Sequence, residues 1–326
     1  MFQVEPVLWL QSIGSPPLTW LLTAVTLLGY TPVYVSAMLV LAFALRLRPS
    51  LAIVGGLLLA GILTEAVKNA VEYPRPDEVD GRVKESYAAH PVRLAHPGGA
   101  KAFWAPPTAE AIAAVRLRAT GDYGFPSGHV AAAAAFLLTT AFFFRSRRAL
   151  ASSALWVPLM ALSRMYLGRH FLADVLGGLL VGVAASGLAV LLFRAFDESV
   201  FGRHDRRARQ AMLPVSVLAL ALLVVTPYQP LLPPAYVGGL VGLVISYAFL
   251  LVTGLPPDGG TARQRLQRVA IGAGLFAVTE GLVHLAGRGS RITSLGGTVI
   301  VAVAALAGTV ALSRRLGLYA VRTAGE

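Results

Sequence analysis

The stretch SLAIVGGLLLAGILTEAVKNAVEYPRP, residues 50–76, is the clearest indication of the fold of this chain. It begins with an apolar run that carries no charge before Glu65, and it ends with Lys68, Arg75 and Pro76. As a helix rising about 1.5 Å per residue, about 20 apolar residues cross the hydrocarbon core of a bilayer. The stretch therefore predicts a membrane-spanning helix with two positive side chains at its far end.

The same kind of apolar block recurs along the whole chain. Of the 326 residues, 56% are apolar and only 13% are charged, a balance that soluble domains do not have. We therefore expect an all-α polytopic integral membrane protein with about nine transmembrane helices. The predicted spans cover residues 17–45, 50–72, 127–144, 149–167, 170–194, 211–227, 235–254, 269–286 and 293–312.

The first of these spans is long and contains the sequence Gly29-Tyr30-Thr31-Pro32. Proline and glycine kink or break helices, so we expect a bend at this point. Two short half-spans would also fit, which leaves ten spans as an alternative.

The positive charge lies mainly in the connections between apolar blocks. A formal net charge of +12 is typical of nucleic-acid-binding proteins, but here the arginines cluster where topology signals of membrane proteins lie. These clusters predict the cytoplasmic side, with the C-terminus inside and the N-terminus outside. We therefore expect contact with membrane lipids and none with nucleic acid. The clusters are Arg46/Arg48, Arg145/Arg147/Arg148, 194–209, Arg263/Arg265/Arg268 and Arg314/Arg315.

Three regions follow from this organisation. Residues 1–196 form the core, with an outer loop over 73–126; residues 197–210 form a cytoplasmic basic linker; residues 211–326 form a four-span extension. Residues 3–13 have the pattern of a short interfacial helix with Trp9 as an anchor, and 107–119 have a helical pattern within the loop. The loop either contacts headgroups or covers a substrate.

Small residues mark close helix packing. The alanines 131–135 and the pairs Gly178/Gly182 and Gly238/Gly242 allow helices to approach one another closely in lipid. We expect these residues to pack and to have no chemical role.

Three short motifs lie at the ends of predicted spans on one side of the membrane. Their charged side chains come from four helix ends and meet at the outer face. The motifs are Lys68-x6-Arg75-Pro76, Pro126-Ser127-Gly128-His129 and Ser163-Arg164-x5-His170-x3-Asp174.

Several of these residue types suit a phosphate group. Arg75 and Arg164 offer planar forks that match phosphate oxygens, and Lys68 adds a compact charge. Ser127 follows a proline and precedes an apolar run, so it can cap a helix, and a helix start beside Gly128 favours an anion. A single arginine or lysine of this set would more often be an interhelical ion pair. Together, the spacing favours a catalytic site.

The two histidines and the aspartate provide the chemistry. His170 and Asp174 are four residues apart and share one helical face, so the carboxylate can hold one ring nitrogen and leave the other as a nucleophile. His129 can then protonate the leaving oxygen. We expect phosphoryl transfer to His170 and hydrolysis by water, with no metal and no cofactor, because three cationic side chains stabilise the charge.

In this order, the three motifs resemble the signature of the type 2 phosphatidic acid phosphatase superfamily, related to glucose-6-phosphatases and vanadium haloperoxidases. The resemblance covers about residues 17–195. It implies His170 as nucleophile, Asp174 as its orienter and His129 as acid. It also implies Lys68, Arg75, Ser127, Gly128 and Arg164 as phosphate-binding residues. Residues 197–326 lie outside the signature, which leaves the substrate class open.

The expected function is a metal-independent membrane phosphatase that hydrolyses lipid phosphate or pyrophosphate monoesters at the outer leaflet. One alternative is a phosphatase of a soluble phosphoester such as glucose-6-phosphate. Another is a lipid-binding or transport protein that uses the phosphate site for recognition. The composition suggests a bacterial inner membrane with the site facing the periplasm. The sequence indicates neither the lipid nor the oligomeric state.

A few charged residues outside the motifs have expected structural partners. Glu65 and Glu72 flank Lys68 at helical spacing and are expected to pair with it. Glu280 and His284 are four apart within a predicted span and are expected to pair with each other, with a pocket or transport role as the alternative.

Overall fold

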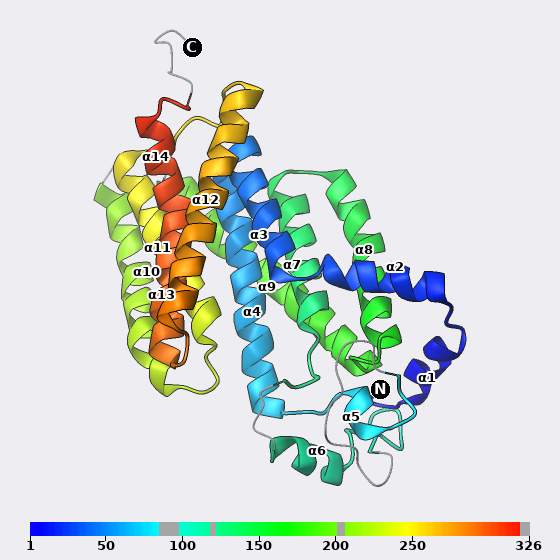
Figure 1. Ribbon diagram of the computed structural model, residues 1–326. Coiled ribbons are helices and arrows are strands. Elements are labelled where there is room, and N and C mark those ends of the chain that lie inside the picture. The colour runs from blue at the N-terminus through cyan, green and yellow to red at the C-terminus, as the bar shows by residue number, and fades with distance from the viewer. Residues whose placement is uncertain (85–97, 118–121, 201–205, 320–326) are drawn as a thin grey trace.

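The computed structural model describes residues 1–84, 98–117, 122–200 and 206–319, and all regular structure in these ranges is helical (Figure 1). The helices of the core are α1 (Glu5–Ser12), α2 (Pro16–Leu27), α3 (Thr31–Val40), the π-helical turn η1 (Leu41–Leu45), α4 (Leu47–Val71), α5 (Pro76–Val79), α6 (Ala109–Arg116), α7 (Gly128–Phe143), α8 (Arg147–Tyr166) and α9 (Leu172–Val200).

The helices of the extension follow. They are α10 (Arg206–Val225), the 3₁₀ turn η2 (Thr226–Tyr228), α11 (Pro234–Thr253), α12 (Ala262–Ala286), α13 (Arg291–Val303), the π-helical turn η3 (Ala304–Gly308) and α14 (Thr309–Arg315).

Helices occur at all nine places where the sequence predicts a span, but the count of nine is not confirmed. Five helical segments in the described ranges are long and apolar enough to cross a membrane, or six with the bent pair α2 and α3–η1. They are Leu47–Val79, Leu172–Arg194, Pro234–Thr253, Ala262–Ala286 and Arg291–Arg315. The composition is thus compatible with an integral membrane protein.

Three helices at predicted spans, α7, α8 and α10, are too short or too polar to meet this requirement of length and apolar character. At about 1.5 Å per residue, the 16 residues of α7 extend only about 24 Å, less than the roughly 30 Å of a hydrocarbon core. Polar residues such as Ser152, Ser153 and Arg164 dilute the apolar character of α8. The apolar segment of α10 begins only at Pro214 and ends with η2 at Tyr228.

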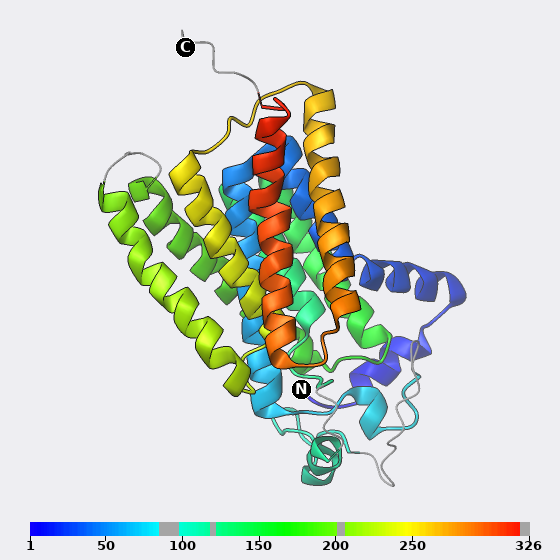
Figure 2. The same cartoon turned by 60° about the vertical axis from the view of Figure 1, so that its left-hand side comes forward.

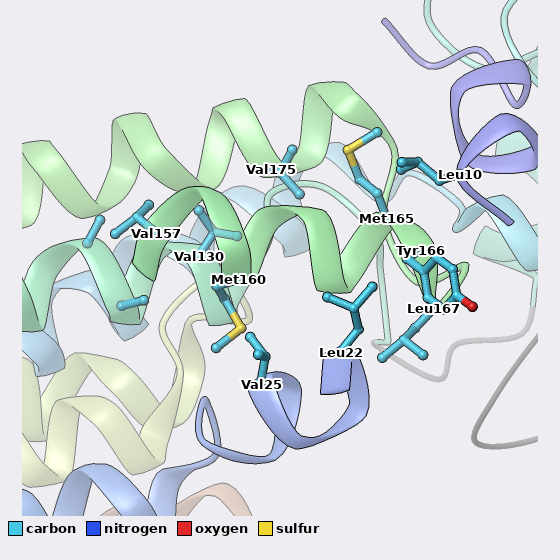
Figure 3. Packing of buried hydrophobic residues seen from close by; sticks show 12 residues of the cluster. Leu10, Leu22, Val25, Val130, Val157, Met160, Met165, Tyr166, Leu167 and Val175 are labelled. Atoms are coloured by element: carbon cyan, nitrogen blue, oxygen red, sulfur yellow. The ribbon is translucent and has the colours of Figure 1, made fainter. Parts of the chain in front are cut away.

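The expected break in the first span is present. The helix axes of α2 and α3–η1 meet at 58°, with Pro32 near the start of α3. Figure 3 shows Leu22 and Val25 of α2 packed against Met160 of α8. The hydroxyl of Thr26 lies 2.6 Å from that of Ser163. α2 therefore packs against α8 and is not in line with α3.

Close approach between helices depends on the small residues that the sequence singled out. The alanines at 131, 133, 134 and 135 in α7 are at most 1% exposed, and α7 packs against α4 and α9. A Cβ on Gly178 or Gly182 of α9 would collide with backbone atoms of Ser127 or Ala131. Gly238 of α11 lies equally close to α13. The prediction that these residues serve packing is confirmed.

The core and the extension form one assembly. α11 packs against α4, and α12 packs against α3 and η1, with α13 beside α11 and α12 (Figures 1 and 2). Asp258, in the connection before α12, accepts a 2.9 Å hydrogen bond from the backbone N–H of Leu47 at the start of α4. The basic linker predicted for 197–210 includes residues 201–205, which lie outside the described ranges.

The two short helices expected near the membrane surface are present. α1 covers Glu5–Ser12 with Trp9 63% exposed, and α6 covers Ala109–Arg116. The Thr108 side chain caps α6 by accepting a hydrogen bond from the N–H of Ala111. In Figure 1, α5 and α6 lie at one end of the bundle, and α14 lies at the opposite end.

Candidate active site

Four helix ends meet beside α5. α4 ends there, α7 and α9 begin there, and α8 finishes at Tyr166 (Figure 1). The C-cap residue of α4, Glu72, has a left-handed backbone with φ of 56°, which turns the chain so that Arg75 caps α5. The structure therefore brings together the three motifs, which lie as much as 106 residues apart between Lys68 and Asp174.

His170 and Asp174 form a buried pair at the start of α9. The Nδ1 atom of His170 lies 3.3 Å from Oδ2 of Asp174, and the two residues are 2% and 0% exposed. The same oxygen accepts a 2.8 Å hydrogen bond from the backbone N–H of Phe171. The carboxylate is therefore fixed, and it can hold the imidazole with a proton on Nδ1 and a lone pair on Nε2.

Arg75 lies at the opposite edge of this imidazole. Its Nη1 lies 3.5 Å from Nε2 of His170, and the residue is only 4% exposed. The guanidinium also donates to the carbonyl of Arg169 at 3.1 Å and to the carbonyl and carboxylate of Asp122. Arg75 is thus held in place by its neighbours, with one edge directed at the ring nitrogen that Asp174 leaves open.

Two residues of this network were missed by the sequence reasoning. Asp122 accepts from Arg75 and from Arg169, the latter at 3.2 Å, and Arg169 also lies 3.6 Å from Asp77. The only signals in the sequence were positions: Arg169 directly precedes His170, and Asp122 lies five residues before Ser127. Neither spacing follows a helical period.

Burial would raise the pKa of the Asp122 carboxyl, but the charge of Arg75, with those of Arg169 and Lys68, outweighs burial and lowers that pKa below its usual value. Asp122 therefore remains a carboxylate and ties the outer loop to the site.

Ser127 stands at the N-cap of α7 but does not cap it with its side chain. Its hydroxyl makes no hydrogen bond to α7, so the expected side-chain cap is wrong. Instead its backbone N–H donates to the carbonyl of Asp174 at 2.8 Å. This bond ties the start of α7 to α9. The serine hydroxyl therefore does not bind the first backbone N–H groups of α7, which begin at Gly128. An anion site at a helix start needs such N–H groups.

Three buried polar atoms lie around the start of α7. Thr64 Oγ1, Ser127 Oγ and His129 Nε2 have no hydrogen-bond partner in the described part of the chain. Buried polar atoms are nearly always paired, so three orphans in one place mark a site built for a polar ligand. The His129 ring stands edge-on to Tyr30, with centroids 4.9 Å apart, which sets the direction of its Nε2.

The remaining cations complete the site. Arg164 is 5% exposed near the end of α8. The positive charges of Arg75, Arg164 and Lys68 all interact electrostatically with the imidazole of His170. Lys68 pairs with Glu65 at 3.1 Å, as expected. Glu72 does not pair with Lys68. The left-handed turn at Glu72 carries its carboxylate to the outer loop, where it binds Arg116 and the Tyr123 hydroxyl, each at 3.0 Å.

A cavity of about 640 Å³ opens from this site into the bundle. Lys68, Gly128 and His129 line one end of it. From there it runs between α3 and α4 of the core and α11, α12 and α13–η3 of the extension, lined mainly by apolar side chains. A cavity of this volume is in the range of small-molecule and cofactor sites.

The expected pairing of Glu280 with His284 is wrong. Glu280 instead binds Arg288, with Oε2 2.6 Å from Nη2, and both line the cavity. Arg288 lies beyond the end of α12, so helical spacing could not reveal it. His284 is exposed and does not line the cavity.

Among the described residues, no group of three or more His, Asp or Glu side chains could hold a metal ion. Cationic side chains lie around His129, His170 and Asp174, an arrangement that suits an anionic ligand. The expectation of a metal-free reaction stays a prediction.

Comparison with known proteins gives one match. No curated protein and no solved structure matches the chain. Residues 49–198 match the model of the PAP2 superfamily, and this segment contains all eight candidate site residues, from Lys68 in α4 to Asp174 in α9. This segment is 150 of the 326 residues and is similar to the PAP2 superfamily, whose members are phosphatases that act on phosphoesters.

Proposed function

We propose that this protein is an integral membrane phosphatase that hydrolyses lipid phosphate or pyrophosphate monoesters through a phosphohistidine on His170. The observation that carries the proposal is the position of the His170 imidazole. Its Nδ1 faces the carboxylate of Asp174 at 3.3 Å, and its Nε2 faces the guanidinium of Arg75 at 3.5 Å. A nucleophilic nitrogen beside a phosphate-binding cation is the arrangement that phosphoryl transfer to histidine needs.

In the first step, the Nε2 lone pair of His170 attacks phosphorus and forms the P–N bond. The P–O bond to the leaving alcohol or phosphate breaks, and His129 gives its proton to that oxygen. Asp174 stabilises the positive charge that develops on the His170 ring, because its Oδ2 lies at the Nδ1 side. The step needs His129 protonated and His170 neutral at the start.

In the second step, water attacks the phosphohistidine. His129, now neutral, takes a proton from the water, the new P–O bond forms, and the P–N bond breaks with its electron pair returning to His170 Nε2. Inorganic phosphate leaves and both histidines regain their starting states. Atoms and charges balance over the cycle with water as the only co-substrate.

The cations lower the barrier in both steps. Charge spreads over the three equatorial phosphate oxygens in the transition state, and fixed positive groups stabilise it. Arg75, Arg164 and Lys68 supply three charges near His170, and the start of α7 adds N–H groups at Gly128. The orphaned hydroxyls of Thr64 and Ser127 can donate to the same oxygens. This set supports a reaction that requires no metal.

The apolar cavity favours a lipid over a soluble ester. It begins at Lys68 and His129 and continues among apolar side chains. The hydroxyl groups of a sugar phosphate would find few polar partners in this space. We further propose that the site faces the outer leaflet, on the periplasmic side of a bacterial inner membrane. Its support is that the arginine clusters at 46–48, 145–148 and 314–315 stand at the helix ends away from the site.

The test is phosphate release by detergent-purified protein in EDTA. The panel holds phosphatidate, phosphatidylglycerol phosphate, sphingosine phosphate, undecaprenyl pyrophosphate and glucose-6-phosphate. His170→Ala should lower turnover by about 10⁴-fold or more, as removal of a nucleophile does. His284→Ala is the matched control, because this histidine is exposed on the extension and does not line the cavity.

Release from lipids that is lost in His170→Ala and kept in His284→Ala supports the proposal. A near-wild-type rate in His170→Ala would exclude the phosphohistidine. Activity on glucose-6-phosphate alone would favour the soluble ester. Transport of a labelled lipid without phosphate release would favour a transporter.

A further inference from the structure

The cavity beside the candidate site has two walls from different regions of the chain. Val35 and Met38 of α3 and Leu57 of α4 belong to the core. Ala302 of α13 and Ala305 of η3 belong to the extension. The second wall lies outside residues 49–198, the segment that matches the PAP2 superfamily. The similarity to that superfamily therefore does not account for it.

The floor between the walls is closed by tight contacts. Gly61 of α4 leaves no room for a Cβ because the Tyr236 ring of α11 lies against it. Gly239 of α11 packs in the same way against Leu58. Where α4 and α11 touch, these glycines let the two helices pack closely. The cavity lies between α3 and α13–η3. The space between these elements is thus set by how the extension docks on the core.

The polar groups of the cavity are unevenly distributed. Thr64, Glu65, Lys68 and His129 lie at the candidate site, and the Glu280–Arg288 ion pair lies on the side of α12. The rest, toward Ala42 and Leu306, is mainly apolar, and its hydroxyl groups belong to threonine and tyrosine residues: Tyr30, Thr31, Tyr34, Tyr236 and Thr298. Glu280 and Arg288 neutralise each other, and Glu65 pairs in the same way with Lys68. An anion would therefore be held at the candidate site, by the cations around His170 that include Arg75 and Arg164. An occupant must be anionic at one end and apolar along the remainder.

We propose that the hydrocarbon chain of the phosphorylated substrate lies in this cavity, and that the extension, through α12, α13 and η3, forms the wall that selects the chain. The proposal rests on the proposed function, since it takes the phosphate to be bound at His170. The ligand class is a phosphate or pyrophosphate monoester with a long alkyl, acyl or isoprenoid chain. Shortening the chain removes contacts with the extension and leaves the phosphate site untouched.

α12 forms the outermost wall of the cavity. It packs on α3 and η1 on one side and on α13 and η3 on the other. Its outward residues Val278, Leu282 and Leu285 are 60%, 61% and 83% exposed, as lipid-facing residues are. Phe276 of the same helix lines the cavity. A single exposed helix thus separates the cavity from the surrounding lipid.

The experiment compares two substrates on each variant. Hexadecyl phosphate and butyl phosphate carry the same phosphate monoester and differ only in chain length. Ala305→Phe puts an aromatic ring into the cavity from the extension, and Val35→Phe does so from the core. Ala304→Phe is the control, because Ala304 is the neighbouring position, is half-buried and does not line the cavity.

We expect Ala305→Phe and Val35→Phe to lower the ratio of kcat/KM for hexadecyl over butyl phosphate by about tenfold or more, the scale of losing several methylene contacts. Ala304→Phe should keep the wild-type ratio. The ratio is measured within each purified protein, so a partly unfolded fraction lowers both rates and cancels.

An unchanged ratio in Ala305→Phe overturns the wall in the extension, even if Val35→Phe changes it. Wild-type protein that hydrolyses butyl phosphate and ignores hexadecyl phosphate overturns chain binding but leaves the phosphatase reaction standing. Wild-type protein that hydrolyses neither, while folded, removes the proposed function and the inference with it.

Discussion

The charged side chains of the candidate site and the ion pair that lines the cavity from the extension differ in burial. Around the candidate site, Arg75, Arg164, His170 and Asp174 are all at most 5% exposed. In the extension, the side chains of Glu280 and Arg288 remain 37% and 32% exposed. Burying a charge is costly unless partners compensate it, so a cluster of buried charges indicates chemistry. The half-exposed ion pair of the extension instead fits a boundary between an apolar cavity and a polar surface.

The packing differs in the same direction. α7 packs closely between α4 and α9 through small alanine and glycine residues, which leaves these helices little room to move at the site. α12 exposes most of its length, and Gly274 and Gly281 on it have open space around them. We infer that the core fixes the reaction geometry while the extension shapes the space for the substrate. Three measurements test this division.

Of these three measurements, the largest effect is expected at His129. His129→Ala should lower kcat on alkyl phosphates by about 10²–10⁴-fold, the usual loss when a general acid is removed. With para-nitrophenyl phosphate, whose leaving group needs no proton, the loss should be much smaller. Steady-state kinetics on both substrates tests this. Equal losses on both would assign His129 to binding and not to proton transfer.

A smaller effect is expected from the two packed glycines. Gly178→Ala places a Cβ against the Ser127 carbonyl and should destabilise the fold by about 1–3 kcal/mol. Because Ser127 adjoins the site, activity on both butyl and hexadecyl phosphate should fall. Gly238→Ala, which meets α13, should also lower the melting temperature but should reduce hexadecyl phosphate turnover more.

Gly187→Ala on α9 is the control for both, since nothing lies within 4 Å of its Cβ position. Thermal unfolding in detergent, followed with both assays, would decide. Identical substrate profiles for Gly178→Ala and Gly238→Ala would contradict the division of labour.

The smallest effect concerns Asp122 and pH. Its pKa is lowered in the folded protein because Arg75 outweighs the effect of burial. Its ion pairs therefore add stability above the unfolded pKa of about 4, and this contribution is lost as the pH falls through the lower folded pKa. Wild-type protein should melt about 2 °C above Asp122→Asn at neutral pH, and the two should converge below about pH 4. A gap that widens on acidification would reverse the sign.

Much of the core could be predicted because its signals are local. A helical period of four residues places His170 beside Asp174, and apolar block lengths locate the helices near their observed bounds. The break near Pro32 follows from the chemistry of a single residue. Such inferences need only a few neighbouring positions.

What the sequence missed depends on contacts across long separations. Asp122 meets Arg75 across 47 residues, and Arg75 meets Arg169 across 94. Arg288 was overlooked for a different reason: it lies past a helix end, where no period applies. The cavity is harder still, because it is a property of how two regions dock and not of any one segment.

The hydrogen bond from the Ser127 N–H to the Asp174 carbonyl has a mechanical consequence. Helices in a bilayer tilt as the local thickness changes. A second hydrogen bond, 3.1 Å from the Thr139 hydroxyl to that of Ser186, joins the same two helices near the other end of α7, so α7 and α9 should tilt as one unit. His129 and His170 lie beside the first bond, within this unit. Membranes of different thickness should therefore alter the shape of the lipid cavity before they alter the spacing of the two histidines.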